Sequence, residues 1–137
     1  MPSRAGVTIK ILTRENLNFY PLMGPWLANR RVITDLGHVP FDDENKTWIV
    51  AIDQGQVVGF VAAITKINHI EYCSDFVEPS SRQLGIYTML FAKRDSIFRG
   101  LQIRAMATHN SLQVYLQNGF FVTRKLKRYM EVKRAPM

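Results

Sequence analysis

The stretch Phe76-Val-Glu-Pro-Ser-Ser-Arg82-Gln-Leu-Gly85-Ile-Tyr87 decides the fold, because it joins a strand to a helix. The residues before it, from about 70 to 77, are typical of a strand that ends at Pro79. One of the two serines that follow provides a cap for a helix that runs to about Phe98. The apolar residues of this helix recur at three- and four-residue spacing, as in an amphipathic helix.

Gly85 and Arg82 make this junction a candidate phosphate site. A glycine in the first turn of a helix lets another group approach the backbone N–H groups, which carry the positive end of the helix dipole. Arg82 adds a charge with a bidentate fork at the same place. The alternative is that Gly85 only allows close helix–sheet packing and that Arg82 is solvated.

Upstream, two apolar runs at residues 48–52 and 57–64 flank a short turn that contains glycine, which predicts a β-hairpin. The alternating, β-branched residues 7–12 predict a further strand. Between them, Thr13 is a candidate cap for a helical region at about residues 15–32. Pro21 and the pair Gly24-Pro25 interrupt that region and predict two short helices, followed by a polar loop at residues 36–47.

Downstream, strands are expected at residues 102–107, 120–124 and about 127–133, with a short helix at about 111–117. The expected order is therefore β-α-α-β-β-β-α-β-α-β-β. It describes an α/β fold whose central sheet is mixed but mostly antiparallel, with about six to seven strands and about four flanking helices. The length of 137 residues fits one domain, residues 1–137.

The composition excludes several classes of protein. The single cysteine, Cys73, excludes an intramolecular disulfide and an all-cysteine metal site, and we expect no metal. No secretory apolar region follows Met1, and the longest apolar run is far shorter than the ~20 residues of a membrane helix. We therefore expect a cytoplasmic protein that does not bind membranes.

The net charge of +7 is unevenly distributed along the chain. Residues 1–81 hold 7 Lys+Arg against 9 Asp+Glu, whereas residues 82–137 hold 11 against 2. This asymmetry indicates a polyanionic partner for the C-terminal half. Nucleic acid, anionic lipid and a phosphate-bearing cofactor all fit this charge.

Two motifs resemble those of a known family. The pattern Val77-x-Pro79-x-x-Arg82-x-x-Gly85-Ile86, followed by an amphipathic helix, resembles motif A of the GNAT superfamily of acyl-CoA-dependent N-acyltransferases. One strand further on, Tyr115-x-x-x-Gly119-Phe120 resembles the family's motif B. The motifs would occupy about residues 70–100 and 110–122. The resemblance covers residues 48–133 well and the N-terminal part loosely.

The resemblance implies that acetyl-CoA, or another short acyl-CoA, binds with its pyrophosphate on the N–H groups of the loop and helix start. Its pantetheine arm would run along the strand edge like an added strand. Asn110 lies two residues after Thr108, the position that often holds a CoA-contacting asparagine in this family. The implied cofactor-binding residues are Phe76, Val77, Arg82, Gln83, Leu84, Gly85, Ile86, Tyr87 and Asn110.

The chain departs from the family pattern in the same loop. Gln83 and Leu84 stand where a glycine and a basic residue are common, and Tyr87 stands where the family usually has Gly or Ala. The Tyr87 ring is expected either to crowd the pyrophosphate or to bind a phosphate oxygen through its hydroxyl.

The family reaction is direct attack of a primary amine on the thioester in a ternary complex. An amine with a pKa of about 10.4 is mostly protonated at neutral pH, so a base must take its proton. Glu71 occupies the strand position where histone-acetyltransferase-like members carry their glutamate base, and His69 and Asp75 are the alternatives. The competing interpretation of Glu71 is a solvated residue or half of an ion pair.

The leaving thiolate needs a proton donor, and the resemblance assigns this role to Tyr115. The alternative is that Tyr115 is a packing aromatic. Cys73 is expected to be a small buried hydrophobic residue rather than a nucleophile.

The acceptor is implied to bind against residues 13–47, where the acidic trio Asp42-Asp43-Glu44 follows the aromatic residues Tyr20, Trp26 and Phe41. This suits a cationic primary amine, either a small molecule or a protein lysine or N-terminus. The alternative is that Tyr20 and Trp26 are core residues of an amphipathic helix. The chain is expected to be a monomer or a homodimer.

A second hypothesis is a binding module with little or no catalysis, which uses the GNAT-like fold to bind nucleic acid or protein. Tyr87 would then close the cofactor groove, and the basic run from Arg124 to Arg128 would hold the partner. A solvated edge that discourages pairing between sheets also explains that run.

Overall fold

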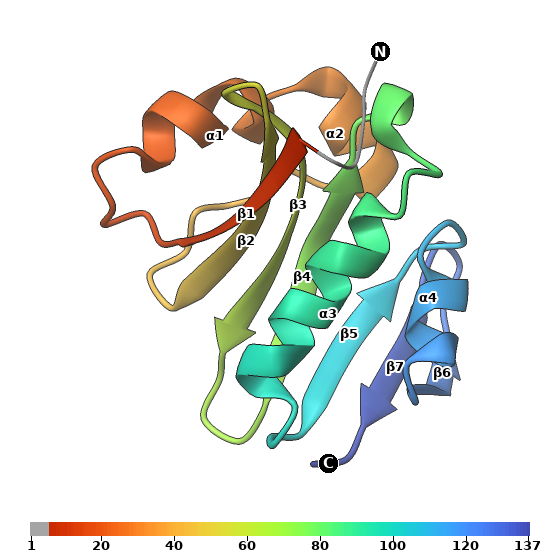
Figure 1. Ribbon diagram of the computed structural model, residues 1–137. Coiled ribbons are helices and arrows are strands. Elements are labelled where there is room, and N and C mark those ends of the chain that lie inside the picture. The colour runs from red at the N-terminus through yellow and green to blue at the C-terminus, as the bar shows by residue number, and fades with distance from the viewer. Residues whose placement is uncertain (1–5) are drawn as a thin grey trace.

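A seven-stranded sheet forms the centre of the computed structural model, which describes residues 6–137 (Figure 1). Its strands are β1 (Val7–Leu12), β2 (Lys46–Asp53), β3 (Gln56–Thr65), β4 (Ile70–Val77), β5 (Ile103–Ala107), β6 (Phe121–Lys125) and β7 (Met130–Arg134). The α-helices are α1 (Phe19–Leu27), α2 (Arg30–Leu36), α3 (Ile86–Phe98) and α4 (Leu112–Gln117), and a short 3₁₀ turn, η2 (Pro79–Ser81), precedes α3.

The strands lie in the order β1-β2-β3-β4-β5-β7-β6. All neighbouring pairs are antiparallel except β4 and β5, which α3 joins as a crossover. The sequence predictions of this element order, of a mostly antiparallel mixed sheet and of one βαβ unit are confirmed.

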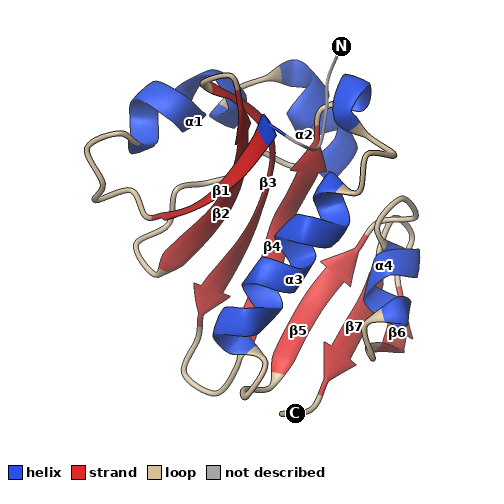
Figure 2. Cartoon of the chain, viewed as in Figure 1, coloured by secondary structure: helices blue, strands red, loops and turns tan. Residues whose placement is uncertain are grey.

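Helices cover both faces of the sheet (Figure 2). α1 and α2 pack on one face through a core that includes Phe19, Met23, Trp48 and Phe60. α3 packs on the opposite face of β2 and β3, and α3 and α4 cover that face of β4, β5 and β7. The helices on the first face do not contribute to the core beyond β4, so β5 and β7 are covered on one side only, and the residues of β6 are all exposed.

A bulge in β4 changes which face its side chains occupy. Ser74 has a φ of 58°, and the register of β4 with β3 shifts between Phe60 and Ala62. Strict alternation would place Asp75 on the face of Glu71, because these residues are four apart. The extra residue reverses the phase, so Asp75 lies on the α3 face while Glu71 and Phe76 lie on the face of α1 and α2.

β4 and β5 separate beyond the bulge. Their parallel pairing covers only the residues from Ile70 to Tyr72 on β4 and from Ile103 to Ala105 on β5. From Cys73 onward, the described residues provide no strand partner for the β5-facing edge of β4. This edge is therefore open to a ligand that can pair with a strand.

Two predicted helix boundaries are wrong. Pro21, Gly24 and Pro25 all lie inside α1, which begins at Phe19 with no cap from Thr13. Pro21 is tolerated because the first turn has no acceptor for its N–H in any case. The break comes at Asn29 instead, whose side chain accepts hydrogen bonds from the backbone N–H groups of Arg31 and Val32 and so starts α2.

The start of α3 was also misplaced. The helix begins at Ile86 rather than directly after Ser80 or Ser81, which belong to η2. Pro79 and its neighbours form this 3₁₀ turn, and the chain then passes through Gln83 and Gly85, both with positive φ (68° and 79°). Two left-handed residues cannot continue a right-handed helix, so the loop extends to Gly85.

Candidate functional site

Two cavities meet where β4 and β5 separate. The first, here called the α3 groove, has a volume of about 540 Å³ and lies along the end of β4, the loop of residues 82–85 and the start of α3. The second, here called the β4 pocket, has a volume of about 470 Å³ and lies between β4 and the loop before β2. Asp75, Thr108 and Ser111 line both cavities, so two ligands that occupy them can come into contact at these residues.

The start of α3 presents backbone donors to the α3 groove. Gly85 precedes the helix in the left-handed region that favours glycine. The first helix donor with a described acceptor is Met89 N–H, which binds Gly85 O at 3.0 Å. The earlier N–H groups from Gly85 to Thr88 have no acceptor among residues 6–137, so they are available to an anion at the positive end of the helix dipole.

Arg82 lies beside these donors and uses part of its guanidinium to hold the loop. Its Nε donates to Val77 O at 2.8 Å, and Nη2 pairs with Asp35 of α2. The side chain is 42% exposed, and Nη1 has no acceptor among the described residues. Asp35 therefore offsets part of the charge, while Arg82 lines the groove with donors that no described residue uses.

The other predicted cofactor residues lie mostly along the same groove. Phe76, Val77, Gln83, Ile86, Tyr87 and Asn110 line it. Leu84 does not: its side chain packs against the core cluster that contains Ile49 and Leu90, so only its backbone is left to serve a ligand. Tyr87 lines the groove without closing it, and its hydroxyl points to Asp75 rather than to the loop.

Asp75 is the centre of a buried hydrogen-bond network between β4, α3 and α4. Arg94 donates from Nη1 and Nη2 to its two carboxylate oxygens, at 2.8 and 3.1 Å. The hydroxyls of Tyr87 and Tyr115 donate to Oδ2 at 2.5 and 2.8 Å. All the described partners of Asp75 are donors, so its carboxylate oxygens are already occupied and it is poorly placed to act as a base.

The surroundings shift the pKa of each partner. Burial, and then the negative charge of Asp75, raise the pKa of the Tyr87 and Tyr115 hydroxyls well above their ordinary value. Burial opposes the charge of Arg94, but Asp75 holds the pKa of its guanidinium well above the usual range. The two tyrosines therefore keep their protons and Arg94 keeps its charge at neutral pH.

Glu71 faces the β4 pocket rather than the α3 groove. It is paired across the sheet with Ile64 of β3, which is paired with Lys46 of β2, so the three residues form one row. All three line the pocket. The Glu71 side chain is 32% exposed, and its carboxylate forms an ion pair with Lys66 Nζ at 3.6 Å. Glu71 therefore both lines the pocket and belongs to an ion pair. His69, the alternative base, lies in the β3–β4 turn and lines neither cavity.

Cys73 lies in the same wall and is half-buried. Burial raises the pKa of its thiol, which disfavours the thiolate that nucleophilic chemistry needs. This agrees with the prediction that Cys73 is a small hydrophobic residue.

The predicted acceptor segment contributes to the β4 pocket only in part. Phe41 and Asp43 line it. Tyr20 instead donates to Asp42 at the surface, and Trp26 packs against Phe60 and Phe76 in the core. Tyr129, from the β6–β7 turn, also lines the pocket and donates to Leu36 O at 3.0 Å.

Two of the three buried cations among residues 6–137 bear on the site, and sequence reasoning missed both. Arg94 is fully buried, at a helix position where basic residues are usually solvated. Its spacing from Ile86 and Leu90, eight and four residues, is the one signal that places it on the buried face. Lys46 is 3% exposed and begins β2 at the edge of a polar loop, where nothing in the sequence distinguishes it from a surface lysine.

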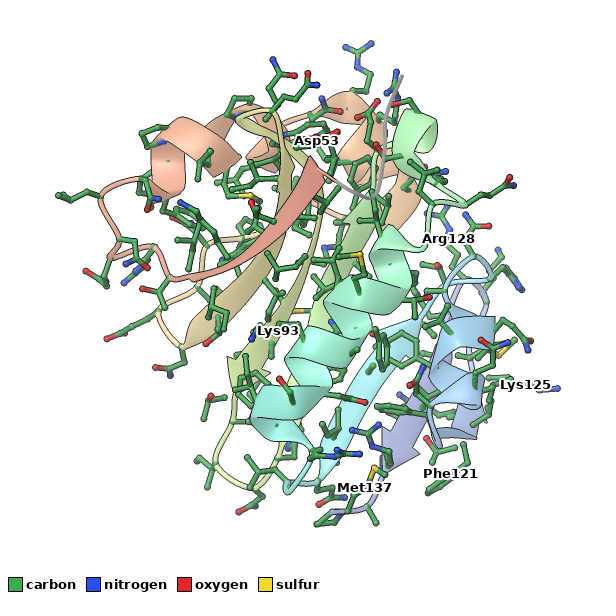
Figure 3. All side chains as sticks on the ribbon, in the orientation of Figure 1. Asp53, Lys93, Phe121, Lys125, Arg128 and Met137 are labelled. Carbon is green, nitrogen blue, oxygen red and sulfur yellow. The ribbon has the colours of Figure 1, made fainter. Side chains whose placement is uncertain are left out.

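The basic run near the C-terminus divides into paired and unpaired residues. Glu131 lies 3.8 Å from Arg124 and 4.0 Å from Lys133, and Arg134 is buried against Asp95. Lys125 points away from the sheet at its outer edge (Figure 3). Glu131 and Asp95 therefore offset only part of the positive charge of residues 124–134.

The chain matches the model of the Acetyltransferase (GNAT) family over residues 11–120. It matches no curated protein. Among the helices of residues 6–137, none has the length and apolar character needed to cross a membrane.

Solved structures share the fold at low identity. Escherichia coli ElaA is 10% identical, with a TM-score of 0.73 over 93% of this chain and 99% of that one. An acyl-CoA N-acyltransferase from Pseudomonas aeruginosa is 11% identical, with a TM-score of 0.69 over 94% and 99% of the two chains. PaiA N-acetyltransferase from Thermoplasma acidophilum, solved in complex with coenzyme A, is 13% identical, with a TM-score of 0.65 over 94% and 98%. The family match, together with the α3 groove and the β4–β5 separation, identifies the chain as a member of the GNAT family of acetyltransferases.

Proposed function

We propose that this protein transfers the acetyl group of acetyl-CoA, or of another short acyl-CoA, to a primary amine by direct attack in a ternary complex. The observation that carries the proposal is that the α3 groove and the β4 pocket share Asp75, Thr108 and Ser111. Two substrates can enter from opposite sides and meet at the point where β4 and β5 separate.

The residues of the α3 groove fit a CoA thioester. The backbone N–H groups from Gly85 to Thr88, with the free donors of Arg82, suit the pyrophosphate. The open edge of β4 at Phe76 and Val77 suits an extended arm that pairs with main-chain groups. The acyl-CoA supplies the activated acetyl group as a thioester.

Glu71 is the base in this proposal. It lies on the wall of the β4 pocket, through which the amine would enter, and its side chain is partly exposed there. An alkylammonium must lose a proton before it attacks, and a carboxylate at hydrogen-bond distance, or one water away, can accept that proton. Asp75 is less suited because Arg94, Tyr87 and Tyr115 already donate to it.

Tyr115 is the proton donor to the departing thiolate. Its hydroxyl lies in the β4 pocket beside the residues shared by the two cavities, and Asp75 fixes its position. To donate, the hydroxyl must turn from Asp75 to the sulfur, while Arg94 keeps the carboxylate paired. Arg94 and Asp75 are thus positioning residues that act through Tyr115.

Calorimetric titration with acetyl-CoA tests the cofactor assignment. Arg82→Ala should weaken binding about tenfold or more, because a charged hydrogen-bond donor is lost. Gly85→Val should also weaken it, because a β-branched residue is strained at a φ of 79° and would alter the loop. Arg124→Ala, far along the sheet and paired with Glu131, is the matched control and should bind like the wild type. Absence of binding by the wild type at millimolar acetyl-CoA would overturn the proposal.

A further inference from the structure

Lys46 places a buried ammonium in the wall of the β4 pocket. The residue is 3% exposed, at the start of β2, and its side chain reaches across β3 to β4. Its Nζ donates to Phe41 O at 2.7 Å and to Ser74 Oγ at 2.9 Å, and it lies 4.2 Å from the centre of the Trp48 ring. An ammonium has three donors, so these two acceptors leave one N–H to satisfy.

The charge of Lys46 has no close counter-ion within the described part of the chain. No carboxylate of residues 6–137 lies within 4 Å of its Nζ. Burying an unpaired charge is expensive, and a neutral donor could bind one carbonyl and one hydroxyl without that cost. Burial lowers the pKa of the Lys46 ammonium, while interactions with Cys73, Asp43 and the more distant Asp42 oppose that change. The described part of the fold therefore supplies no anion to pair with the charge of Lys46.

The other end of the pocket has the opposite charge. Lys46 and Glu71 are the outer members of the row that Ile64 completes, so two strand spacings, about 10 Å, separate their backbones. The Lys46 side chain crosses part of that distance to reach Ser74. Apolar residues such as Val39, Phe41 and Met106 line the space around the two charges. A small molecule that carries both an amine and an acid matches this arrangement.

We propose that the acceptor is an amino acid or a similar small amine with a carboxylate, whose carboxylate pairs with Lys46 while its amine faces Glu71. This inference rests on the proposed function, because it names the acceptor class of the same site. Lys46 determines specificity in this assignment and takes no part in the proton transfers. The volume of the β4 pocket, about 470 Å³, suits a small molecule better than a protein chain.

Matched pairs of amines test the acceptor class. The panel consists of the common α-amino acids, β-alanine and γ-aminobutyrate, each beside the amine that lacks only the carboxylate. Each compound is titrated calorimetrically into protein saturated with CoA, where no transfer takes place, and is then assayed with acetyl-CoA by release of the CoA thiol. At least one carboxylate-bearing amine should bind about tenfold or more tightly than its partner and should show the same preference in kcat/KM.

Two variants assign that preference to Lys46. Lys46→Gln keeps an N–H donor for Phe41 O and Ser74 Oγ but removes the charge, and Lys46→Met removes both. Each should abolish the preference for the carboxylate while CoA binding is unchanged. Lys10→Met, at an exposed position of β1, is the matched control and should keep the preference.

The outcomes separate the two proposals. If CoA binds but no carboxylate-bearing amine binds better than its partner, the acceptor class is wrong and the proposed transferase stands. If the preference exists but survives in Lys46→Gln, another group binds the carboxylate and the role of Lys46 is wrong. If CoA itself does not bind, the proposed function fails, and this inference fails with it.

Discussion

Asp75 on β4 and Arg94 on α3 form a bidentate ion pair inside the protein, with N···O distances of 2.8 and 3.1 Å. The Arg94 side chain is fully buried and that of Asp75 is 8% exposed. Arg94 also donates to Ala62 O on β3 at 3.0 Å, so it connects the helix to two strands. The ion pair fixes the position of the Asp75 carboxylate. The hydroxyls of Tyr87 and Tyr115 donate to this carboxylate and are oriented by it.

Arg94→Met should destabilise the protein by about 3–5 kcal/mol, because Asp75 would become a buried charge without a counter-ion. The free energy of unfolding in urea measures the loss. Lys93→Met, at an exposed position of the same helix, is the control and should change stability by less than about 0.5 kcal/mol.

The double variant Asp75→Asn, Arg94→Met should recover part of the loss, since no charge then remains buried at this place. If Arg94→Met unfolds at the same urea concentration as the wild type, the ion pair does not stabilise the protein.

Gly37 lies directly against Tyr129, a residue that lines the β4 pocket. Gly37 ends α2 with a φ of 83°, and a Cβ at this position would overlap with the Tyr129 hydroxyl and lie 3.2 Å from its ring. Gly37→Ala should therefore cost more than the ~1–2 kcal/mol of backbone strain alone. It should also raise KM for the acceptor, because Tyr129 and Leu36 line that pocket.

Gly55 provides the matched control for Gly37. It has a similar φ of 78°, and a Cβ there meets nothing within 4 Å. Gly55→Ala should thus show only the backbone strain, measured by urea unfolding, and an unchanged KM. Equal losses of stability in the two variants would mean that the Tyr129 contact is not rigid.

Glu71→Gln should lower kcat about 10²–10⁴-fold at neutral pH, because the amine must then lose its proton without a base. The loss should shrink as the pH approaches the acceptor's own pKa, where a large part of the amine is already neutral. A pH–rate profile of both proteins checks this. Glu78→Gln also removes a paired carboxylate, but outside both cavities, and should retain the wild-type profile. A Glu71→Gln profile identical to the wild type would exclude Glu71 as the base.

Stability should fall as the pH rises above about 10. Burial raises the pKa of Tyr87 and Tyr115 above the ordinary value of 10.0, so these hydroxyls keep their protons in the folded protein after the unfolded chain has lost them. Folding then takes up protons, and the free energy of unfolding decreases by up to about 1.4 kcal/mol per pH unit for each tyrosine. Below pH 10 both states are protonated and this loss is absent.

Tyr115→Phe should make the alkaline decrease shallower, as measured by urea unfolding between pH 9 and 11. A slope unchanged from the wild type would show that Tyr115 ionises as readily in the folded protein as in the unfolded chain.

Most of the fold could be predicted from local patterns. Apolar alternation and the glycine-containing turn of residues 53–56 were sufficient for the β2–β3 hairpin, and the strand of residues 70–77 was predicted with its observed bounds. Helix ends were less predictable, because Pro25 lies inside α1 where packing of Phe19 and Met23 on the sheet outweighs one lost hydrogen bond. The loop before α3 could not be predicted either. Gln83 has a positive φ, and nothing in the sequence indicates this conformation for a residue other than glycine.

The candidate site was predictable in its glycine, arginine and tyrosine positions but not in its charges. Gly85, Arg82 and Tyr115 carry motif spacings that can be read along the chain. The partners that decide their behaviour come from distant positions: Asp35 for Arg82, and Asp75 with Arg94 for Tyr115. Lys46 and Arg94 look like surface residues in the sequence because burial of a cation depends on which elements pack around it.

The sequence by itself determined the order of the elements, the position of the proposed phosphate loop at Arg82–Gly85 and the basic character of the C-terminal half. These features depend on neighbours along the chain, through turn residues, side-chain alternation and helix spacing. Only the tertiary structure decided that Asp75 lies on the opposite face from Glu71, because a bulge at Ser74 shifts the strand by one residue. It also decided that β4 and β5 separate and that Lys46 lines the β4 pocket, since both depend on packing between residues far apart in the sequence.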